Sequence, residues 1–258
     1  MKYRCVLAGM LLLSGSTLHA LEKPIKMDKP IIAKDRAFIG GGLYLQSQPY
    51  EETDGFTAIS PVVFFDNELF YVRWTRLGMY FMGGKNWGAS VTLQPRPFGY
   101  ETSDSQTFAG MANRNASWEG GLSIAGKNDL GFAELTFFTD LLDNSEGSLL
   151  RLELGKKIAT NKWTFVPSLL AIYFDEKFNN YYYGVAANEA TATRAFYVAP
   201  AGLNLAAQSY INYDINKNWH LLGNIRADYL SSGISDSPIV SKRYMLSGLV
   251  SVMYSFEY

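Results

Sequence analysis

Residues 244–258 read YMLSGLVSVMYSFEY, and this stretch decides the fold. Its alternate positions form one unbroken apolar row: Tyr244, Leu246, Gly248, Val250, Val252, Tyr254, Phe256 and Tyr258. Because successive side chains of a β-strand point to opposite faces, the stretch predicts a long strand with one wholly apolar face.

The same alternation recurs along the chain. In 219–229 one face is apolar from Trp219 to Tyr229, whereas the other face is mainly polar. Long helical patterns are absent. The remaining segments with this split are 87–96, 117–125, 150–157 and 203–212. The chain is therefore predicted to be all-β.

Alternation alone fits two folds. A soluble sandwich turns its apolar faces inward, whereas a transmembrane barrel turns them toward lipid and its polar faces toward the lumen. The segments run to about ten residues, which matches the ~9–11 needed to cross a membrane and exceeds the ~5–6 common in sandwich strands. Aromatic rings gather at the segment ends, as at membrane boundaries. We therefore predict a closed antiparallel transmembrane β-barrel that contacts outer-membrane lipid.

The aromatic end of the chain supports the same prediction. A sandwich with such an exposed edge would invite aggregation. The row that closes with Tyr254, Phe256 and Tyr258 resembles the insertion signal by which the outer-membrane assembly machinery recognises bacterial barrels. These three residues are therefore predicted to be the insertion signal.

The composition excludes several other classes of protein. The 258 residues are 48% hydrophobic and 18% charged, which argues against a disordered chain. The formal net charge of −1 leaves no basic footprint for nucleic acid, so no nucleic-acid partner is expected. A mean hydropathy of −0.05 argues against a bundle of transmembrane helices.

Residues 1–20 are predicted to be a cleaved signal peptide, with a positively charged start, an apolar run over 6–13 and a cleavage site at Ala20. Residues 21–35 then form a charged, proline-containing lead. We expect this lead to be a flexible periplasmic linker, with contact to periplasmic partners or murein as the alternative.

Cleavage changes the chemistry that is available to the mature chain. It removes the only cysteine, Cys5, and leaves a single histidine, His220. Disulfides, thiolate chemistry and a metal site built from several His or Cys ligands are therefore excluded, and no cofactor is expected.

Loop lengths predict the strand count. The connections 98–114, 175–195 and 231–241 are long, and the others are short turns, with examples at Lys127–Asn128 and Asp214–Asn218. Long loops in such barrels are extracellular and short turns periplasmic. With both chain ends in the periplasm the strand number must be even.

The front half of the chain leaves the count open between two values. Its candidate strands are 36–48, 57–65, 68–74, 77–83 and 86–97, with a tight bend near Thr75–Arg76. If 68–83 were a single strand, the N-terminus would emerge outside the cell. We predict about twelve strands in a barrel that occupies residues 36–258, with ten strands as the alternative.

Charged residues fall on the face predicted to line the lumen. These residues are Arg96, Glu119, Glu134, Arg151, Glu153, Arg226 and Asp228. They are interpreted as an interior ion-pair network, because charges in a narrow barrel need partners. A selectivity lining for a small pore is the alternative.

Two further features have competing interpretations. His220 is a candidate base for a barrel hydrolase, but the nearest position on its own face carries Leu222 instead of a nucleophilic serine, so a lumen-lining or turn histidine is favoured. The cluster Tyr181, Tyr182 and Tyr183 in a long loop fits a binding surface. It fits equally an aromatic girdle or a segment folded over the lumen.

Three blocks of sequence point to a known family. The first is Phe108-Ala109-Gly110-Met111 with Arg114, Ser117, Glu119 and Gly120 beyond it. The second is Tyr182-Tyr183-Gly184-Val185 followed by Glu189-Ala190 and Tyr197, and the third is Asp236-Ser237-Pro238-Ile239-Val240. In this order they resemble the MipA/OmpV (MltA-interacting protein) family of outer-membrane proteins.

The resemblance implies an outer-membrane barrel without established catalytic activity. It also implies a scaffold role, in which such a barrel joins a lytic transglycosylase that degrades murein to a penicillin-binding protein that synthesises it. We therefore predict a non-enzymatic envelope scaffold or binding protein, with N- and C-termini in the periplasm. A small outer-membrane pore is the first alternative, and a barrel hydrolase that uses His220 is the second.

Overall fold

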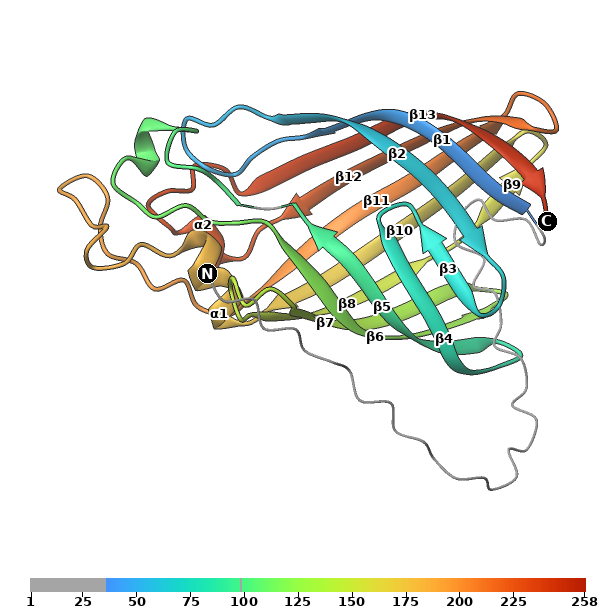
Figure 1. The fold of residues 1–258 in the computed structure, drawn as a ribbon, viewed down its shortest axis with the longest axis horizontal. Helices are drawn as coiled ribbons and strands as arrows, with labels where there is room; N and C mark the ends of the chain where they lie inside the picture. Colours follow the sequence, from blue (N-terminus) through green and yellow to red (C-terminus); the bar gives the residue numbers. More distant parts are fainter. Residues whose placement is uncertain (1–35, 98) are drawn as a thin grey trace, which may run out of the picture.

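A computed structural model describes residues 36–97 and 99–258. Within that part, the chain forms one antiparallel sheet that closes into a barrel (Figure 1). The strands are β1 Arg36–Gln46, β2 Phe56–Asp66, β3 Phe70–Arg73, β4 Arg76–Gly84, β5 Trp87–Arg96, β6 Ser117–Asn128, β7 Gly131–Asp140, β8 Ser148–Gly155, β9 Ile158–Thr160, β10 Trp163–Phe174, β11 Gly202–Asp214, β12 Trp219–Tyr229 and β13 Tyr244–Glu257. The predicted signal peptide 1–20 and lead 21–35 lie outside the described residues.

The barrel closes where β1 meets β13. These strands pair from Arg36–Glu257 to Gln46–Ser247. The segments β8 and β9 both pair with β10, so together they form one strand interrupted at Lys156 and Lys157. The ring therefore has twelve strands, as predicted, and the alternative of ten is wrong.

The bend expected near Thr75–Arg76 is a two-residue loop, Trp74–Thr75, which joins β3 to β4. Another turn was predicted two residues too early: β6 continues through Lys127 and Asn128, and the chain turns at 129–130. The reason is that the Asn128 side chain accepts hydrogen bonds from the N–H groups of the next turn, at Leu130 and Gly131, and so starts the turn instead of lying within it.

The two ends of the barrel differ. One end, here called the loop end, carries the connections 47–55, 97–116, 141–147, 175–201 and 230–243. These include the short helices η1 Gln106–Phe108, α1 Glu176–Tyr183 and α2 Ser232–Ser235. The opposite end, the short-turn end, carries only tight turns and Tyr258. None of the helices in the described residues is long and apolar enough to span a membrane.

The outer surface of the wall is apolar. Large aliphatic side chains stand out from it, with Ile59 88%, Val250 70% and Leu169 66% exposed. The predicted insertion signal lies on this surface, because Tyr254, Phe256 and Tyr258 are 40–49% exposed. A continuous apolar band of this kind suits lipid and not water. The polar residues of each strand point inward, as the alternation predicts.

Closure of the ring predicts a difference between two neighbouring glycines. A Cβ atom at Gly40 would overlap the Val252 carbonyl oxygen on β13, whereas the nearest atom to a Cβ at Gly41 is 3.9 Å away. Gly40→Ala should therefore cost about 1–3 kcal/mol in the free energy of unfolding, as overpacking does. The folded barrel and the unfolded chain migrate differently on gels of unheated samples, so the folded fraction can be followed against urea concentration to measure this cost. The matched variant Gly41→Ala should lie within about 0.5 kcal/mol of the parent, and equal stabilities would contradict the β1–β13 seam.

Candidate functional site

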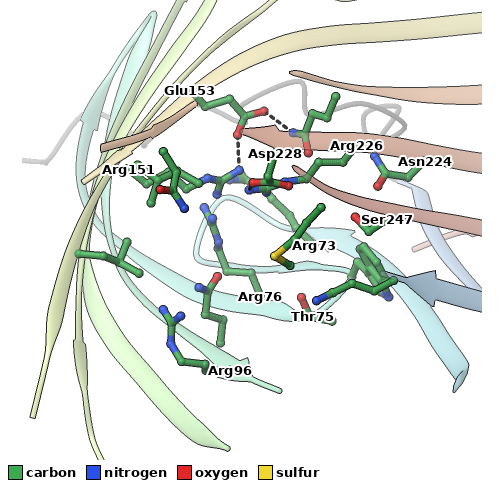
Figure 2. Close-up of a pocket in the computed structure, with 18 of the residues that line it drawn as sticks. Arg73, Thr75, Arg76, Arg96, Arg151, Glu153, Asn224, Arg226, Asp228 and Ser247 are labelled. Atoms are coloured by element: carbon green, nitrogen blue, oxygen red, sulfur yellow. Dashed lines mark hydrogen bonds and ion pairs between the residues drawn. The ribbon is translucent and has the colours of Figure 1, made fainter. Parts of the chain in front are cut away.

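A cavity of about 280 Å³ lies inside the barrel (Figure 2). Five arginines line it: Arg73, Arg76, Arg96, Arg151 and Arg226. Only two carboxylates, Glu153 and Asp228, belong to the same lining. Apolar and aromatic side chains complete the wall, among them Phe64, Trp74 and Phe174. The cavity thus combines positive charge with apolar surface.

Each of these arginines has a carboxylate partner. Two partners lie on the same strand, two residues along, in the pairs Arg151–Glu153 at 2.7 Å and Arg226–Asp228, where Nε donates at 2.8 Å. The other three are Arg73–Asp66 at 3.3 Å, Arg76–Glu134 at 2.8 Å and Arg96–Glu119. Removing one member of such a buried pair typically costs about 3–5 kcal/mol, so the pairs also fix the interior geometry.

The residues predicted to line the lumen fall into three groups. Arg96, Arg151, Glu153, Arg226 and Asp228 line the cavity. Glu119 and Glu134 are only 3% and 2% exposed and pair with Arg96 and Arg76. His220 does not belong to the cavity lining.

The sequence analysis missed Arg73 and Arg76. They flank the loop of a hairpin whose first strand, β3, has only four residues. That is too short for a period of two to be recognised. The sequence did hold one signal: Arg73 and Arg76 flank a predicted two-residue bend, so they pair across the hairpin and their side chains lie on the same face.

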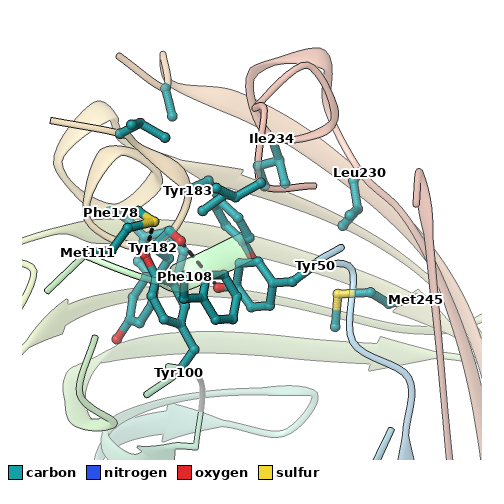
Figure 3. Packing of buried hydrophobic residues seen from close by; sticks show 13 residues of the cluster. Tyr50, Tyr100, Phe108, Met111, Phe178, Tyr182, Tyr183, Leu230, Ile234 and Met245 are labelled. Atoms are coloured by element: carbon teal, nitrogen blue, oxygen red, sulfur yellow. Dashed lines mark hydrogen bonds between the residues drawn. The ribbon is translucent and has the colours of Figure 1, made fainter. Parts of the chain in front are cut away.

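The loop end of the lumen is closed by packed aromatic residues (Figure 3). Tyr100 stacks on Phe108 with ring centroids 3.9 Å apart, and Tyr50 contacts both rings edge-on. Tyr182 packs with them from helix α1, and residues of all three long loops join the cluster. We call this cluster the loop plug; its buried members are Tyr50, Tyr100, Phe108, Met111, Phe178, Tyr182, Tyr183, Val185, Ala199, Leu230, Ile234, Ile239 and Met245.

The tyrosine cluster belongs to this plug. Tyr182 and Tyr183 are 0% and 8% exposed, so they cannot form the binding surface that was one interpretation of the loop. Tyr181 is half-buried, and its hydroxyl accepts a hydrogen bond from the Asn115 N–H at 2.9 Å. Asp175 starts helix α1 by accepting a hydrogen bond from the Phe178 N–H, and the buried face of this helix, with Phe178, Tyr182 and Tyr183, packs into the plug.

One carboxylate ties the plug together. Glu189 accepts hydrogen bonds from the N–H groups of Ala112 at 2.8 Å and Ala186 at 3.1 Å. Arg114 donates to both carboxylate oxygens at 3.0 and 3.1 Å. Burial alone would raise the pKa of Glu189, but these hydrogen bonds and the Arg114 charge outweigh burial and lower the pKa. Glu189 thus joins the 97–116 loop to the 175–201 loop.

The short-turn half of the lumen is filled as well. Phe38, Val62, Phe64, Leu222, Leu249 and Met253 form a buried cluster inside the barrel. A second inward cluster in this half contains Ala125, Phe132 and Val166. The cavity therefore lies between the loop plug and an apolar filling.

His220 has a nucleophile within reach after all. Its Nδ1 lies 2.7 Å from Asp214 Oδ1 and its Nε2 lies 2.9 Å from Ser255 Oγ. Leu222 does occupy the nearest position on the same strand, and the serine within reach, Ser255, comes instead from the neighbouring strand β13. Ser255 is, however, 0% exposed and does not line the cavity. The arrangement offers no access to a substrate and fastens β11, β12 and β13 together.

The described residues contain no group of three His, Cys, Asp or Glu side chains that could hold a metal ion. The arginine-lined cavity is thus the candidate site that the structure offers, and its chemistry suits binding.

Comparisons with known proteins were made at the level of sequence and of structure. A family model described as MltA-interacting protein MipA matches residues 39–256. The MltA-interacting protein of Escherichia coli strain K12 is 25% identical, over 88% of this chain and 92% of its own length. The putative outer membrane protein YiaT of the same strain is 24% identical, over 84% of this chain and 90% of its own.

One solved structure that aligns with the barrel is the COG4313 outer membrane channel from Pseudomonas putida F1. It has 9% sequence identity and a TM-score of 0.44, and the alignment covers 90% of this chain and 99% of that one.

The position of Glu189 predicts that the plug depends on pH. The pKa of Glu189 is lower in the folded chain than in the unfolded one, so its stabilisation is complete above about pH 4.3 and is lost as pH falls toward the folded value. Glu189→Gln removes hydrogen bonds to a charged group, worth about 1.5–3 kcal/mol, and should raise the open population of the loop roughly 10–100-fold at pH 7. Hydrogen exchange of residues 185–197, followed by mass spectrometry, measures this population.

The acid response separates Glu189 from other carboxylates. After correction for intrinsic exchange, the parent should be protected in this loop at pH 7 and should lose that protection below about pH 4. Glu189→Gln should be poorly protected at pH 7 and below pH 4 alike. An unchanged acid response in Glu189→Gln would contradict this role.

Proposed function

The chain belongs to the MltA-interacting protein (MipA) family of outer-membrane β-barrels, and on that premise we propose that it is a non-enzymatic envelope scaffold. In this role the barrel anchors a murein-remodelling enzyme at the outer membrane. The observation that carries the proposal is the filled lumen: the loop plug closes one end and an apolar cluster fills the other.

A filled lumen favours a scaffold over a pore. A diffusion pore keeps a continuous aqueous channel, as large barrels do. Here Phe108, Tyr182 and Met253 are 0% exposed within the barrel and its plug. The paired charges also favour a structural network over a selectivity lining, because each arginine of the cavity already has a carboxylate.

The burial of Ser255 supports a role without catalysis. A serine nucleophile must reach the atom that it attacks, yet Ser255 Oγ lies in a fully buried residue whose neighbours are His220 and the Lys217 carbonyl. Neither Ser255 nor His220 belongs to the lining of the described cavity.

The docking face that we propose is the short-turn end, facing the periplasm together with both chain termini. Its exposed lysines are Lys85, Lys156, Lys157, Lys162 and Lys217. The loop end carries mainly acidic exposed residues, among them Glu51, Glu52, Asp54, Glu101 and Asp104. The exposed charges of the short-turn end are thus mainly positive, and residues 21–35, with four lysines and three acidic residues, would add one net positive charge.

The name of a relative suggests the partner. A protein called MltA-interacting protein matches this chain over 88% of its length, so we propose a lytic transglycosylase as the docked enzyme. A penicillin-binding protein is proposed as the second component, because a scaffold that couples murein degradation to synthesis needs both.

Retention of a purified lytic transglycosylase on the immobilised barrel in neutral detergent tests this proposal. The variant Lys156→Gln/Lys157→Gln/Lys162→Gln removes three exposed charges from one part of the short-turn end. We expect it to lower retention at least 5-fold, because charged rims steer and hold partners. Deletion of 21–35 should lower retention further.

The matched control is Lys177→Gln/Lys242→Gln/Arg243→Gln, which removes three exposed charges from the loop end and should leave retention unchanged. If the parent barrel retains no transglycosylase, the scaffold role is wrong. If both triple variants behave alike, the assignment of the docking face is wrong.

A further inference from the structure

The barrel wall is interrupted on one side. Strand β2 has eleven residues, but β3 pairs with only its last three, Phe64 to Asp66. Strand β5 pairs with β4 from Trp87 to Leu93, and beyond that point only with β6. In the described chain, therefore, residues 56–63 of β2 and 94–96 of β5, at the loop end of these strands, have no strand between them. Figure 1 shows the β3–β4 turn midway along the wall, with β2 and β5 continuing past it.

This gap is bounded on all sides, and we call it the window. The β3–β4 hairpin forms its edge toward the short-turn end. Its edge toward the loop end is formed by two loops that meet, because Ser105 Oγ donates to the Glu51 carbonyl at 3.0 Å and the ring centroids of Tyr50 and Tyr100 are 5.2 Å apart. At the level of the hairpin, β2 and β5 are three inter-strand spacings apart, roughly 14 Å.

The window lies at membrane depth, where an open sheet edge is costly. Backbone groups that face hydrocarbon without a partner cost several kcal/mol each, so open edges occur only where they line a cavity. The Trp74 N–H donates to the Val63 carbonyl at 2.8 Å, so the backbone groups of Val63 and of the alternate residue Pro61 point toward the window. Proline has no N–H to leave unpaired there. On the opposite edge Pro95 lies just past Leu93, and proline within sheets is confined to edges and bulges.

The window leads to the arginine-lined cavity. Trp74 and Thr75, at the tip of the hairpin, line that cavity. Trp74 lies on the lumen side of the opening: its Nε1 donates to Ser60 Oγ on β2 at 2.9 Å, and the ring centroids of Trp74 and Tyr44 are 5.4 Å apart. Its φ of +57° is a conformation that glycine usually supplies in two-residue hairpin loops. A tryptophan held there against its backbone preference points to a role for the ring.

The chemistry of the cavity identifies the kind of ligand. Each of the five arginines has a carboxylate partner, but only two of these carboxylates, Glu153 and Asp228, line the cavity, so guanidinium groups predominate among the charged groups at its surface. Among the described residues the buried Nε of Arg73, a side chain that lines the cavity, has no hydrogen-bond partner. Phe64, Leu149 and Ile172 provide apolar surface in the same lining. An anionic head and an acyl chain would each find a matching part of this wall.

We propose that the window is a lateral portal, through which an amphiphile with one acyl chain and a carboxylate or phosphate head passes from the outer membrane into the cavity. Trp74 is the gate of this portal. The arginines hold the head, and the chain lies along the apolar lining toward the window. The portal does not depend on the scaffold role, because it uses the wall and the lumen and not the short-turn end.

Cysteine labelling in proteoliposomes tests the route. Cys5 is the only cysteine of the chain, so Ser60→Cys and Ser251→Cys each introduce a single thiol into a Cys5→Ser background. Ser60 is half-buried at the window, whereas Ser251 is 2% exposed in a part of the wall paired on both sides. We expect N-phenylmaleimide, which is lipid-soluble, to label Ser60→Cys at least 10-fold faster than Ser251→Cys. Saturating dodecanoate should protect Ser60→Cys from this labelling.

Three outcomes would overturn the portal. They are equal labelling of the two variants, labelling of Ser60→Cys that dodecanoate does not reduce, and equally fast labelling by a sulfonated maleimide, which would mean access from water through the loops.

Calorimetry in dodecyl maltoside tests the ligand. Dodecanoate and dodecyl phosphate should bind saturably, and dodecanol and inorganic phosphate should bind at least 10-fold more weakly. Arg226→Gln/Asp228→Asn, which keeps the cavity neutral overall, should weaken dodecanoate binding at least 10-fold. The control Lys177→Gln/Glu146→Gln removes an exposed ion pair at the loop end and should change nothing.

Equal binding of dodecanol would show that the arginines do not select the ligand. Equal binding of inorganic phosphate would show that a free anion suffices. An unchanged affinity in Arg226→Gln/Asp228→Asn would place the ligand elsewhere. Each of these results overturns the assignment.

Discussion

The structure depends on the pairing of backbone N–H and C=O groups where no water is available to replace a partner. In a bilayer this pairing requires a sheet with no free edge, and the β1–β13 seam provides it from Arg36 to Gln46. Closure then fixes the two faces of every strand. One face meets lipid and must be apolar, and the other encloses a narrow lumen in which charges need partners. The alternation of the sequence and the arginine–carboxylate pairs are both consequences of that single constraint.

The interior of the barrel is organised in layers along its axis. An apolar filling occupies the short-turn half, the arginine-lined cavity follows, and the loop plug covers the other end. In this order the short-turn end and the cavity are separate sites for binding. The short-turn end is free to meet a periplasmic partner, while the cavity communicates with the membrane through the interruption between β2 and β5. A scaffold and a lipid-binding cavity are compatible in one barrel because they use different surfaces.

Much of the fold could be predicted from the sequence, because the rows in 219–229 and 244–258 alternate cleanly. Strand β3 was predicted as well, within 68–74, but its four residues are too few to show which side chains point inward, so Arg73 and Arg76 could not be recognised as lumen residues. Nor could the contact of His220 with Ser255 be predicted, because it depends on the register that sets His220 opposite Met253. The filled lumen did leave a signal. Strand β10, WTFVPSLLAIYF, is mainly apolar on both faces, as is typical of a strand buried on both sides.

Backbone amide exchange in lipid bilayers, resolved by solid-state NMR, tests closure most directly. The account predicts that amides along the β1–β13 seam are as strongly protected as those between β11 and β12. It also predicts that Thr57 and Ile59, whose N–H groups face the window, exchange much faster than Ala58 and Ser60, which face β1. Rapid exchange along the seam would contradict a closed ring. Equal protection of all four β2 amides would contradict the interruption in the barrel wall.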